Sequence, residues 1–269
     1  MRIRDALLLC PAIGLIAGCA GTGAMKGGDA DAAGASIGSI SSITAAVADA
    51  SRPSGDRERD TQRKPAECLQ FAGVKPGARV VELLPGGGYF TRLFSVAVGP
   101  TGQVIAVAPP KSAGAAPAAP EPSARVQALA ADPHYANVQV VVMRLAELKL
   151  AEPADIVWTS LNYHDVHNVS GIDMHAFNRG VFELLKPGGI YIVIDHAAPA
   201  GSGASDTSTL HRIDPETVRS EVLAAGFEWV GQSDVLRNPD DPRTVPVFDA
   251  SIRGKTDQFV FKFRRPKGA

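Results

Sequence analysis

The sequence predicts an α/β protein built on a mostly parallel sheet with helices on both faces. Apolar segments of strand length alternate with helical ones from Ile43 to Pro266, and glycine and proline separate the elements. The segment 190–194 is apolar throughout, as strands covered on both faces are. No internal repeat is visible, and a section of this length can bury the core of one domain.

Seven strands and five helices are expected in the order that this alternation gives. The expected strands are 79–84, 103–107, 138–143, 154–159, 190–194, 227–236 and 258–264. The expected helices are 57–71, 89–98, 123–131, 173–185 and 214–225. The last helix has clear signals at both ends, because Asp214 precedes Pro215 and Gly226 follows Ala225. The last two strands are expected to form an antiparallel pair.

A glycine turn joins the first strand to the helix that follows it. Gly86, Gly87 and Gly88 allow the backbone to turn tightly, and the N–H groups of a helix N-terminus face the turn. The dinucleotide fingerprint requires a further glycine where Thr91 stands, so that motif is not present. We expect a small ligand at this turn, with a tight corner that binds nothing as the alternative.

Polar side chains follow the fourth and fifth strands directly. Ligands of open α/β sheets bind beyond the carboxyl ends of the strands, so these residues are candidates for a site. They are Asn162, Tyr163, His164, Asp165, Asp195 and His196. The alternatives are that they only hold loops in place, or that His164, Asp165, His167 and His196 bind a metal. We assign no metal ligands from the sequence.

The glycine turn with Glu82 before it resembles motif I of the class I S-adenosylmethionine (SAM)-dependent methyltransferases. The turn 184–189 and the strand 155–160 resemble the corresponding parts of that family. The resemblance implies a Rossmann-like, seven-stranded fold and a methyl transfer from SAM. It implies that SAM contacts Glu82, Pro85, Gly86, Gly87 and Gly88, with Glu82 near its amino acid part.

The resemblance also implies roles for the residues that follow strands four and five. His164 is expected as the catalytic base near neutral pH, oriented by Asp165 or Asp195, with Tyr163 beside it. Asn162, Asp195 and His196 are expected to bind a small-molecule substrate. A closer resemblance, to exported predicted methyltransferases, is carried by residues 60 and 63–65, 162–165, 195–196, 211–214 and 254–257.

The sequence departs from the family at two acidic positions. The second strand ends in Ala108 where an acid usually binds the ribose, and Arg144 follows the third strand where an acid is usual near the adenine. Loss of a carboxylate–hydroxyl contact costs about 1.5–3 kcal/mol of binding free energy. A ligand- or partner-binding protein that has lost catalysis is therefore the alternative function.

The N-terminus predicts export. Arg2 and Arg4 precede an apolar segment that is too short to span a membrane. Residues 16–19 resemble the bacterial lipoprotein signal, which implies that residues 1–18 are removed and that Cys19 is lipidated. We expect a lipid anchor in the cell envelope that faces the periplasm, in the outer membrane rather than the inner one because Ala20 follows the cysteine.

The rest of the chain is expected to form a flexible tether, 19–42, and a globular domain, 43–266. The tether is rich in Ala, Gly and Ser, although Ile37, Ile40 and Ile43 have helical spacing. Cys68 has no disulfide partner in the mature chain and is expected in the core. A net charge of −1 argues against nucleic acid as the main partner.

Overall fold

The structure, a computed structural model, describes residues 27–112, 114–116 and 118–268. The predicted signal sequence and the lipidation at Cys19 lie outside the described residues. Within these ranges no helix has the length and apolar character needed to cross a membrane.

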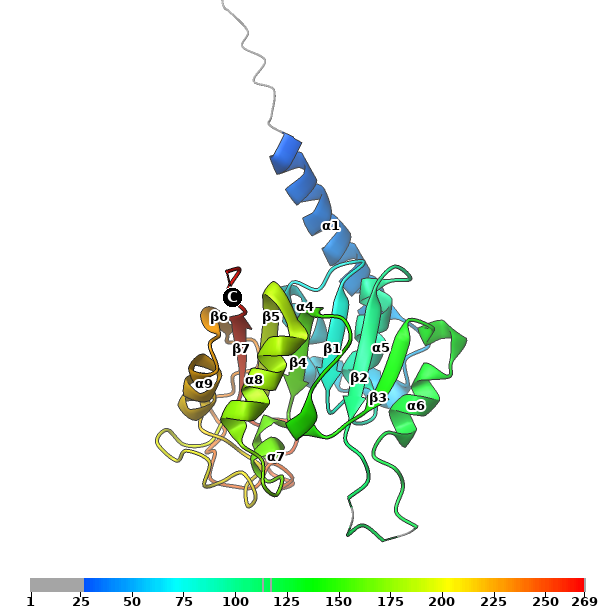
Figure 1. Ribbon diagram of the computed structural model, residues 1–269. Helices are drawn as coiled ribbons and strands as arrows, with labels where there is room; N and C mark the ends of the chain where they lie inside the picture. The colour runs from blue at the N-terminus through cyan, green and yellow to red at the C-terminus, as the bar shows by residue number, and fades with distance from the viewer. Residues whose placement is uncertain (1–26, 113, 117, 269) are drawn as a thin grey trace, which may run out of the picture.

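One seven-stranded sheet forms the centre of the molecule (Figure 1). Its strands are β1 Arg79–Leu83, β2 Gln103–Ala108, β3 Val138–Val142, β4 Ala154–Ser160, β5 Leu185–His196, β6 Glu228–Ser233 and β7 Gln258–Arg264. Their order across the sheet is β3-β2-β1-β4-β5-β7-β6, and β7 runs antiparallel to both of its neighbours. The predicted mostly parallel sheet and the antiparallel final pair are confirmed.

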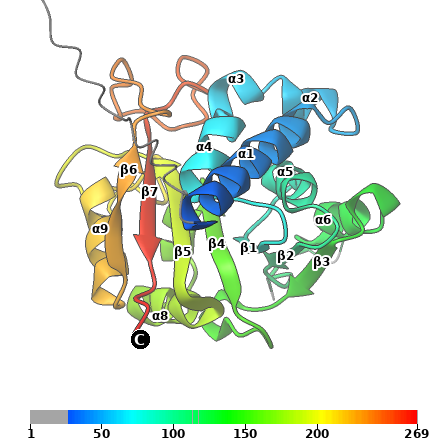
Figure 2. The same ribbon diagram turned by 90° about the horizontal axis from the view of Figure 1, so that it is seen from above.

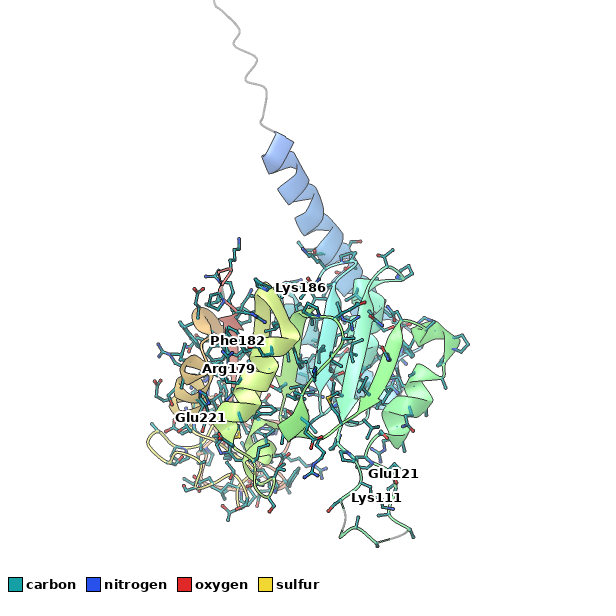
Figure 3. All side chains as sticks on the ribbon, in the orientation of Figure 1. Lys111, Glu121, Arg179, Phe182, Lys186 and Glu221 are labelled. Atoms are coloured by element: carbon teal, nitrogen blue, oxygen red, sulfur yellow. The ribbon has the colours of Figure 1, made fainter. Side chains whose placement is uncertain are left out.

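Helices cover both faces of the sheet (Figure 2). Helices α1 (Gly27–Ala48), α4 (Pro65–Ala72) and α5 (Tyr89–Val98) lie on one face, while α8 (Met174–Leu184) and α9 (Pro215–Ala224) lie on the other. The shorter helices are α2 Ser54–Arg57, α3 Asp60–Arg63, α6 Ala124–Ala130 and α7 Tyr163–His167, with single 3-10 turns at Pro133–Tyr135 and Leu145–Glu147. Between β2 and α6 runs the Ala/Pro-rich loop that carries Lys111 and Glu121 (Figure 3).

The two faces of the sheet bury separate hydrophobic clusters. On β4, Trp158 belongs to the α1–α4–α5 side, where its ring lies 4.7 Å from Phe90, while Val157 belongs to the α8–α9 side. Both side chains are fully buried. Removal of each large apolar side chain from water contributes about 1.5–3 kcal/mol, so the two faces together fix the register of the central strands.

The sequence analysis and the structure differ at two places. Within the segment expected as a tether, α1 begins at Gly27, and Ile43 and Ala46 in the C-terminal part of this helix are buried against the domain. The helix predicted over 57–71 is broken at Lys64, which adopts a φ of 43° before Pro65. A residue before proline is disfavoured in the α region, so α3 ends and α4 begins at this point.

Candidate functional site

The glycine turn between β1 and α5 has the backbone conformation that its sequence requires. Gly86 and Gly88 have φ values of 57° and 81°, in the left-handed region that side chains disfavour. A Cβ atom on Gly88 would lie 2.5 Å from Leu129 Cδ1, whereas a Cβ atom on Gly86 would meet nothing within 4 Å. Gly88 is therefore required by packing, and Gly86 borders open space.

That open space is a pocket of about 340 Å³, which we call the glycine-loop pocket. Its volume is at the lower end of the range for small-molecule sites. Its wall combines the turn with α3, α5, α6 and the end of β4. The lining residues are Arg59, Arg63, Glu82, Leu84, Pro85, Gly86, Gly87, Tyr89, Phe90, Arg125, Ser160, Leu161 and Asn162.

Glu82 is a buried carboxyl group on this wall. It is 4% exposed, and the Thr91 hydroxyl donates a hydrogen bond to its Oε2 at 2.5 Å. Burial raises its pKa to about 8, against the opposing effects of Thr91 and the nearby Arg63. Within the described residues it is the one carboxyl group that lines the pocket, since Ala108 and Arg144 hold the positions where acids were expected.

Arg63 is a cation that also lines this pocket, and no described carboxylate forms an ion pair with it. Its guanidinium stacks over the rings of Tyr89, at 4.2 Å, and Phe90, at 4.8 Å, and donates to Ser160 Oγ at 3.1 Å. Burial lowers its pKa. Arg63 belongs to a motif of the closer resemblance but had no predicted role, and only its unpaired charge among the described residues marks it as a site residue.

The position of Arg63 is fixed by an ion pair beneath it. Asp60, three residues earlier on α3, accepts hydrogen bonds from both Nη atoms of the buried Arg52, at 2.6 and 2.8 Å. The Tyr89 hydroxyl donates to the same carboxylate at 2.6 Å. Burial opposes the charge on Asp60, but Arg52 and Tyr89 outweigh it and lower the pKa of the carboxyl group. Arg52 also donates to the carbonyl oxygen of Val47 in α1, so these bonds connect α3 to both α1 and α5.

A second pocket of about 340 Å³ lies beside the first, and we call it the β5-end pocket. Arg59, Arg63 and Leu161 line both pockets, so the two share a wall. The remaining lining residues are Gln62, His196, Val247, Phe248, Arg253, Gly254, Thr256 and Gln258. None of them is acidic. This pocket therefore offers cationic, aromatic and imidazole groups to whatever enters it.

His196 is a neutral imidazole on the wall of the β5-end pocket. Its Nδ1 lies 2.7 Å from Thr256 Oγ1, which also accepts a hydrogen bond from Gln258 Nε2. Burial lowers the pKa of His196 to about 4, although the nearby Asp195 opposes this effect. The ring is therefore uncharged at neutral pH.

Asn162, which was predicted to bind the substrate, lines the glycine-loop pocket instead of the β5-end pocket. Leu161, with a φ of 61°, turns the chain after β4, and the Asn162 amide then donates to the carbonyl oxygens of Leu83 and Leu84 at 3.3 and 3.2 Å. These bonds fix the orientation of the amide. They leave Asn162 Oδ1 as a buried acceptor without a partner.

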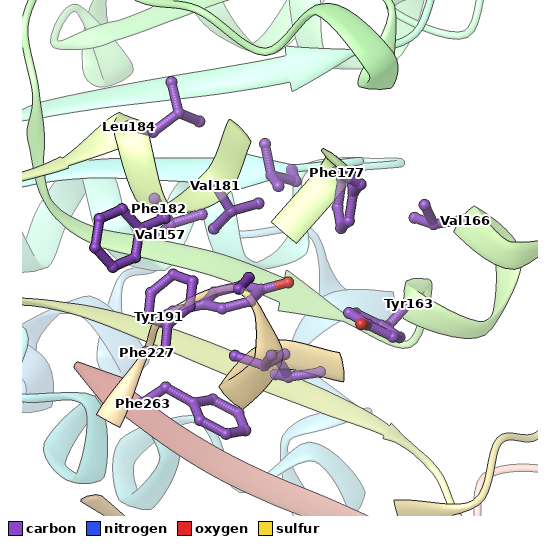
Figure 4. Close-up of a cluster of buried hydrophobic side chains, with 14 of the residues drawn as sticks. Val157, Tyr163, Val166, Phe177, Val181, Phe182, Leu184, Tyr191, Phe227 and Phe263 are labelled. Carbon is purple, nitrogen blue, oxygen red and sulfur yellow. The ribbon is translucent and has the colours of Figure 1, made fainter. Parts of the chain in front are cut away.

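Tyr163 does not join the pocket wall, so its predicted catalytic position is wrong. Its ring lies in the hydrophobic cluster between the sheet and α8 (Figure 4). Its hydroxyl donates to Glu221 Oε2 at 2.8 Å and accepts from Asn178 Nδ2 at 2.7 Å. Side chains that follow each other at the start of a helix point in different directions, so the four consecutive residues do not share one wall.

His164 is buried between the two carboxylates that were predicted to orient it. Its Nδ1 lies 2.8 Å from Asp195 Oδ1, and its Nε2 lies 3.3 Å from Asp165 Oδ1. Burial opposes the charged ring, but Asp195 and Asp165 outweigh it and raise the pKa of His164 to about 10, which contradicts its predicted role as a base near neutral pH. Asp195 was predicted to bind the substrate, but it is fully buried against His164 and lines neither pocket.

A further hollow of the described surface lies away from these two pockets. It measures about 750 Å³ and is lined by residues 99–103 and 136–139, at the start of β2 and β3. This is the amino edge of the sheet, opposite to the edge where α/β proteins bind ligands. Its single titratable lining residue is His134, so we do not regard it as the site.

Comparisons with known proteins identify the fold. No protein-family model matches the chain, and no curated protein matches it in sequence. A SAM-dependent methyltransferase from Aquifex aeolicus is similar in structure, with a TM-score of 0.53 and 17% identity over 77% of this chain and 98% of its own. A SAM-dependent methyltransferase from Mesorhizobium loti aligns with a TM-score of 0.53 and 17% identity over 77% and 100% of the two chains.

A third solved structure with the same architecture is named for a different reaction. The [4+2]-cyclase SpnF aligns with a TM-score of 0.55 and 17% identity over 76% of this chain and 81% of its own. Identities at this level establish the fold and not the reaction. The chain has the class I methyltransferase fold, with its two pockets at the carboxyl edge of the sheet.

Proposed function

We propose that the protein is a SAM-dependent methyltransferase that binds SAM in the glycine-loop pocket and a small-molecule acceptor in the β5-end pocket. The observation that carries the proposal is the adjacency of two pockets at the carboxyl edge of a methyltransferase fold, with Arg63 and Leu161 in both. Methyl transfer requires two ligands aligned within bonding distance, and a shared wall provides that alignment.

The groups around the glycine-loop pocket fit the amino acid part of SAM. Asn162 Oδ1 is a buried acceptor that has no partner among the described residues, and an ammonium group would satisfy it. Arg63 forms no ion pair with a carboxylate of the described residues, and a ligand carboxylate would pair with it. Gly86 leaves room for a ligand to pass the backbone closely. When bound, SAM would supply the electrophilic methyl group.

We assign the role of proton acceptor to His196. The imidazole is neutral and lies on the wall of the β5-end pocket, whereas both ring nitrogens of His164 are occupied by carboxylates. A general base must carry a free lone pair near the reacting group. The Arg63 and Arg253 guanidinium groups would attract an acceptor that carries negative charge.

A non-catalytic ligand-binding protein is the second candidate. Ala108 is buried at the end of β2 and leaves the ribose of SAM without its usual acidic partner. The [4+2]-cyclase shows that this architecture also occurs in a protein named for other chemistry.

Calorimetry separates the two candidates. The purified protein is titrated with SAM and with S-adenosylhomocysteine. If it is a methyltransferase, we expect both compounds to bind saturably at one site per chain. Failure to bind either compound at millimolar concentration would contradict it. An Ala108→Asp variant should tighten binding about 10-fold, because it restores a carboxylate at the ribose position.

We further propose that the protein is exported and anchored through a lipid on Cys19, facing the periplasm. The Ala20 that follows the cysteine favours the outer membrane over the inner one. The support is the basic start, the short apolar segment and the motif at 16–19. In a Cys19→Ala variant, the protein should leave the membrane fraction or stay unprocessed. Normal processing with full membrane retention would show that the anchor lies elsewhere.

A further inference from the structure

Three potential metal-ligand atoms meet at the carboxyl edge of the sheet. His164 Nε2, a carboxylate oxygen of Asp165 and a ring nitrogen of His211 all lie within 4.8 Å of one another. Asp165 Oδ1 is 3.3 Å from His164 Nε2 and 3.5 Å from His211 Nδ1. Tetrahedral zinc bonds of ~2.0–2.1 Å separate neighbouring ligand atoms by about 3.4 Å, so both separations from Asp165 Oδ1 match those of a zinc site.

Asp195 supplies the outer contact that metal-binding histidines require. Its Oδ1 lies 2.8 Å from His164 Nδ1, which leaves Nε2 as the nitrogen that faces Asp165. The carboxylate is held in turn by the backbone N–H groups of His164 and His196, both at 2.8 Å. A carboxylate on the far ring nitrogen fixes the orientation of a histidine ligand and strengthens it as a donor.

His211 reaches the cluster through an unfavourable backbone conformation. Its φ is 54°, a left-handed value that is costly for a residue with a large side chain. The next residue holds this conformation, because the fully buried Arg212 forms an ion pair with Asp241 at 2.8 Å and donates to the carbonyl oxygen of Ala197. The folded chain thus maintains a strained residue whose ring points toward Asp165.

We propose that His164 Nε2, Asp165 and His211 Nδ1 bind one divalent transition-metal ion. Two imidazoles and a carboxylate suit Zn²⁺ and its neighbours better than Mg²⁺ or Ca²⁺, which prefer oxygen ligands alone. The carboxylates of Asp165 and Asp195 together balance the charge of the ion. The Asp165 and His211 side chains are 49% and 33% exposed, so the site opens to solvent on one side.

The site would lie next to the β5-end pocket. The His211 ring packs against Phe248 at a centroid distance of 5.0 Å, and Phe248 lines that pocket. The other histidines that the sequence offered for a metal are engaged elsewhere: His167 contacts Glu221 at 3.1 Å, and His196 contacts Thr256. The ligand set therefore differs from the one that sequence spacing suggested.

The test is zinc binding by the purified protein. The protein is stripped with a chelator, dialysed against Zn²⁺, and analysed for metal content and for affinity by competition with a chromophoric chelator. We expect one Zn²⁺ per chain. Asp165→Asn and His211→Ala should each weaken binding at least about 10-fold, because even outer-contact substitutions cost ~10–100-fold in metal affinity.

His175→Ala is the matched control, since His175 is exposed on α8 and outside the cluster. Its zinc affinity should equal that of the unchanged protein. Circular dichroism verifies that each variant is folded. We expect Asp165→Asn to fold like the unchanged protein, because the Asp165 side chain is half exposed. Less than one bound Zn²⁺, or equal affinity in all three variants, would overturn the proposal and leave the cluster as an ion-pair network.

Discussion

The glycine-loop pocket and the β5-end pocket share a wall but are assembled differently. Much of the first comes from one continuous segment, in which β1, the glycine turn and α5 follow each other along the chain. The second brings together α3, the end of β5 and the loop before β7, which are far apart in sequence. A pocket formed by one continuous segment can be predicted from a sequence motif, whereas a pocket formed by distant segments can be recognised only in the tertiary structure.

The largest effect is expected at the local pocket. Gly86→Val should reduce binding of S-adenosylhomocysteine at least about 100-fold, because the added side chain enters the open space that the ligand needs and disfavours a φ of 57°. Calorimetry measures the affinity. Gly73→Val is the matched control, since Gly73 has a φ of 80° and open space but lies at the end of α4, away from the pocket. If both variants bind S-adenosylhomocysteine equally well, the ligand does not bind at the glycine turn.

The assembled pocket is tested at His196. His196→Ala should lower the release of S-adenosylhomocysteine ~10²–10⁴-fold when a cell-envelope extract supplies the acceptor, as loss of a general base does. Its free energy of unfolding should change much less, with His175→Ala as the exposed control. His164→Ala should instead lose mainly stability, because the buried Asp195 is left without the partner at 2.8 Å. Full turnover by His196→Ala would show that another residue accepts the proton.

The shared wall is tested at Asp60. Asp60→Ala leaves the fully buried Arg52 guanidinium without its carboxylate, so we expect a loss of about 3 kcal/mol in the free energy of unfolding. Lys186→Ala, which removes a more exposed ion pair with Asp155, should cost less than about 1 kcal/mol by the same urea titration. Similar losses in both variants would show that the ion pair under α3 does not stabilise this wall.

The smallest effect concerns Glu82 and pH. The folded state raises the pKa of Glu82 from 4.5 to about 8, so the folded protein retains a proton that the unfolded chain releases. The stability of the unchanged protein should therefore fall as pH rises from about 4.5 through 8. Glu82→Gln lacks this dependence, and its stability relative to the unchanged protein should rise by at least about 1 kcal/mol between pH 5 and pH 9. A constant difference across that range would show that Glu82 is ionised when folded.

The fold of this chain is shared with proteins that are named for different reactions. The [4+2]-cyclase and the two methyltransferases share one architecture with this chain at the same 17% identity. The fold therefore positions a site without selecting its reaction. The residues that would select it here, Arg63, His196 and the cluster around Asp165, come from the assembled part of the edge.

The order of the elements and the place of the glycine turn can be read from the sequence alone. Helix α5 runs from Tyr89 to Val98 as predicted, and every predicted strand is present, because apolar periodicity and glycine act over short stretches of chain. Strand β5 differs most, since it begins at Leu185, within the segment predicted as a turn. His196 lies at the β5-end pocket, where the end of a parallel strand is expected to meet a ligand, whereas Asn162 lines the neighbouring glycine-loop pocket.

The protonation states of the site residues and the orientations of their side chains depend on the tertiary structure. Tyr163 and His164 are neighbours, yet one enters the core and the other lies between Asp165 and Asp195. The two site histidines have pKa values shifted in opposite directions, because carboxylates surround His164 whereas burial dominates at His196. Burial and through-space charge depend on segments that are distant in sequence, so no local pattern encodes them.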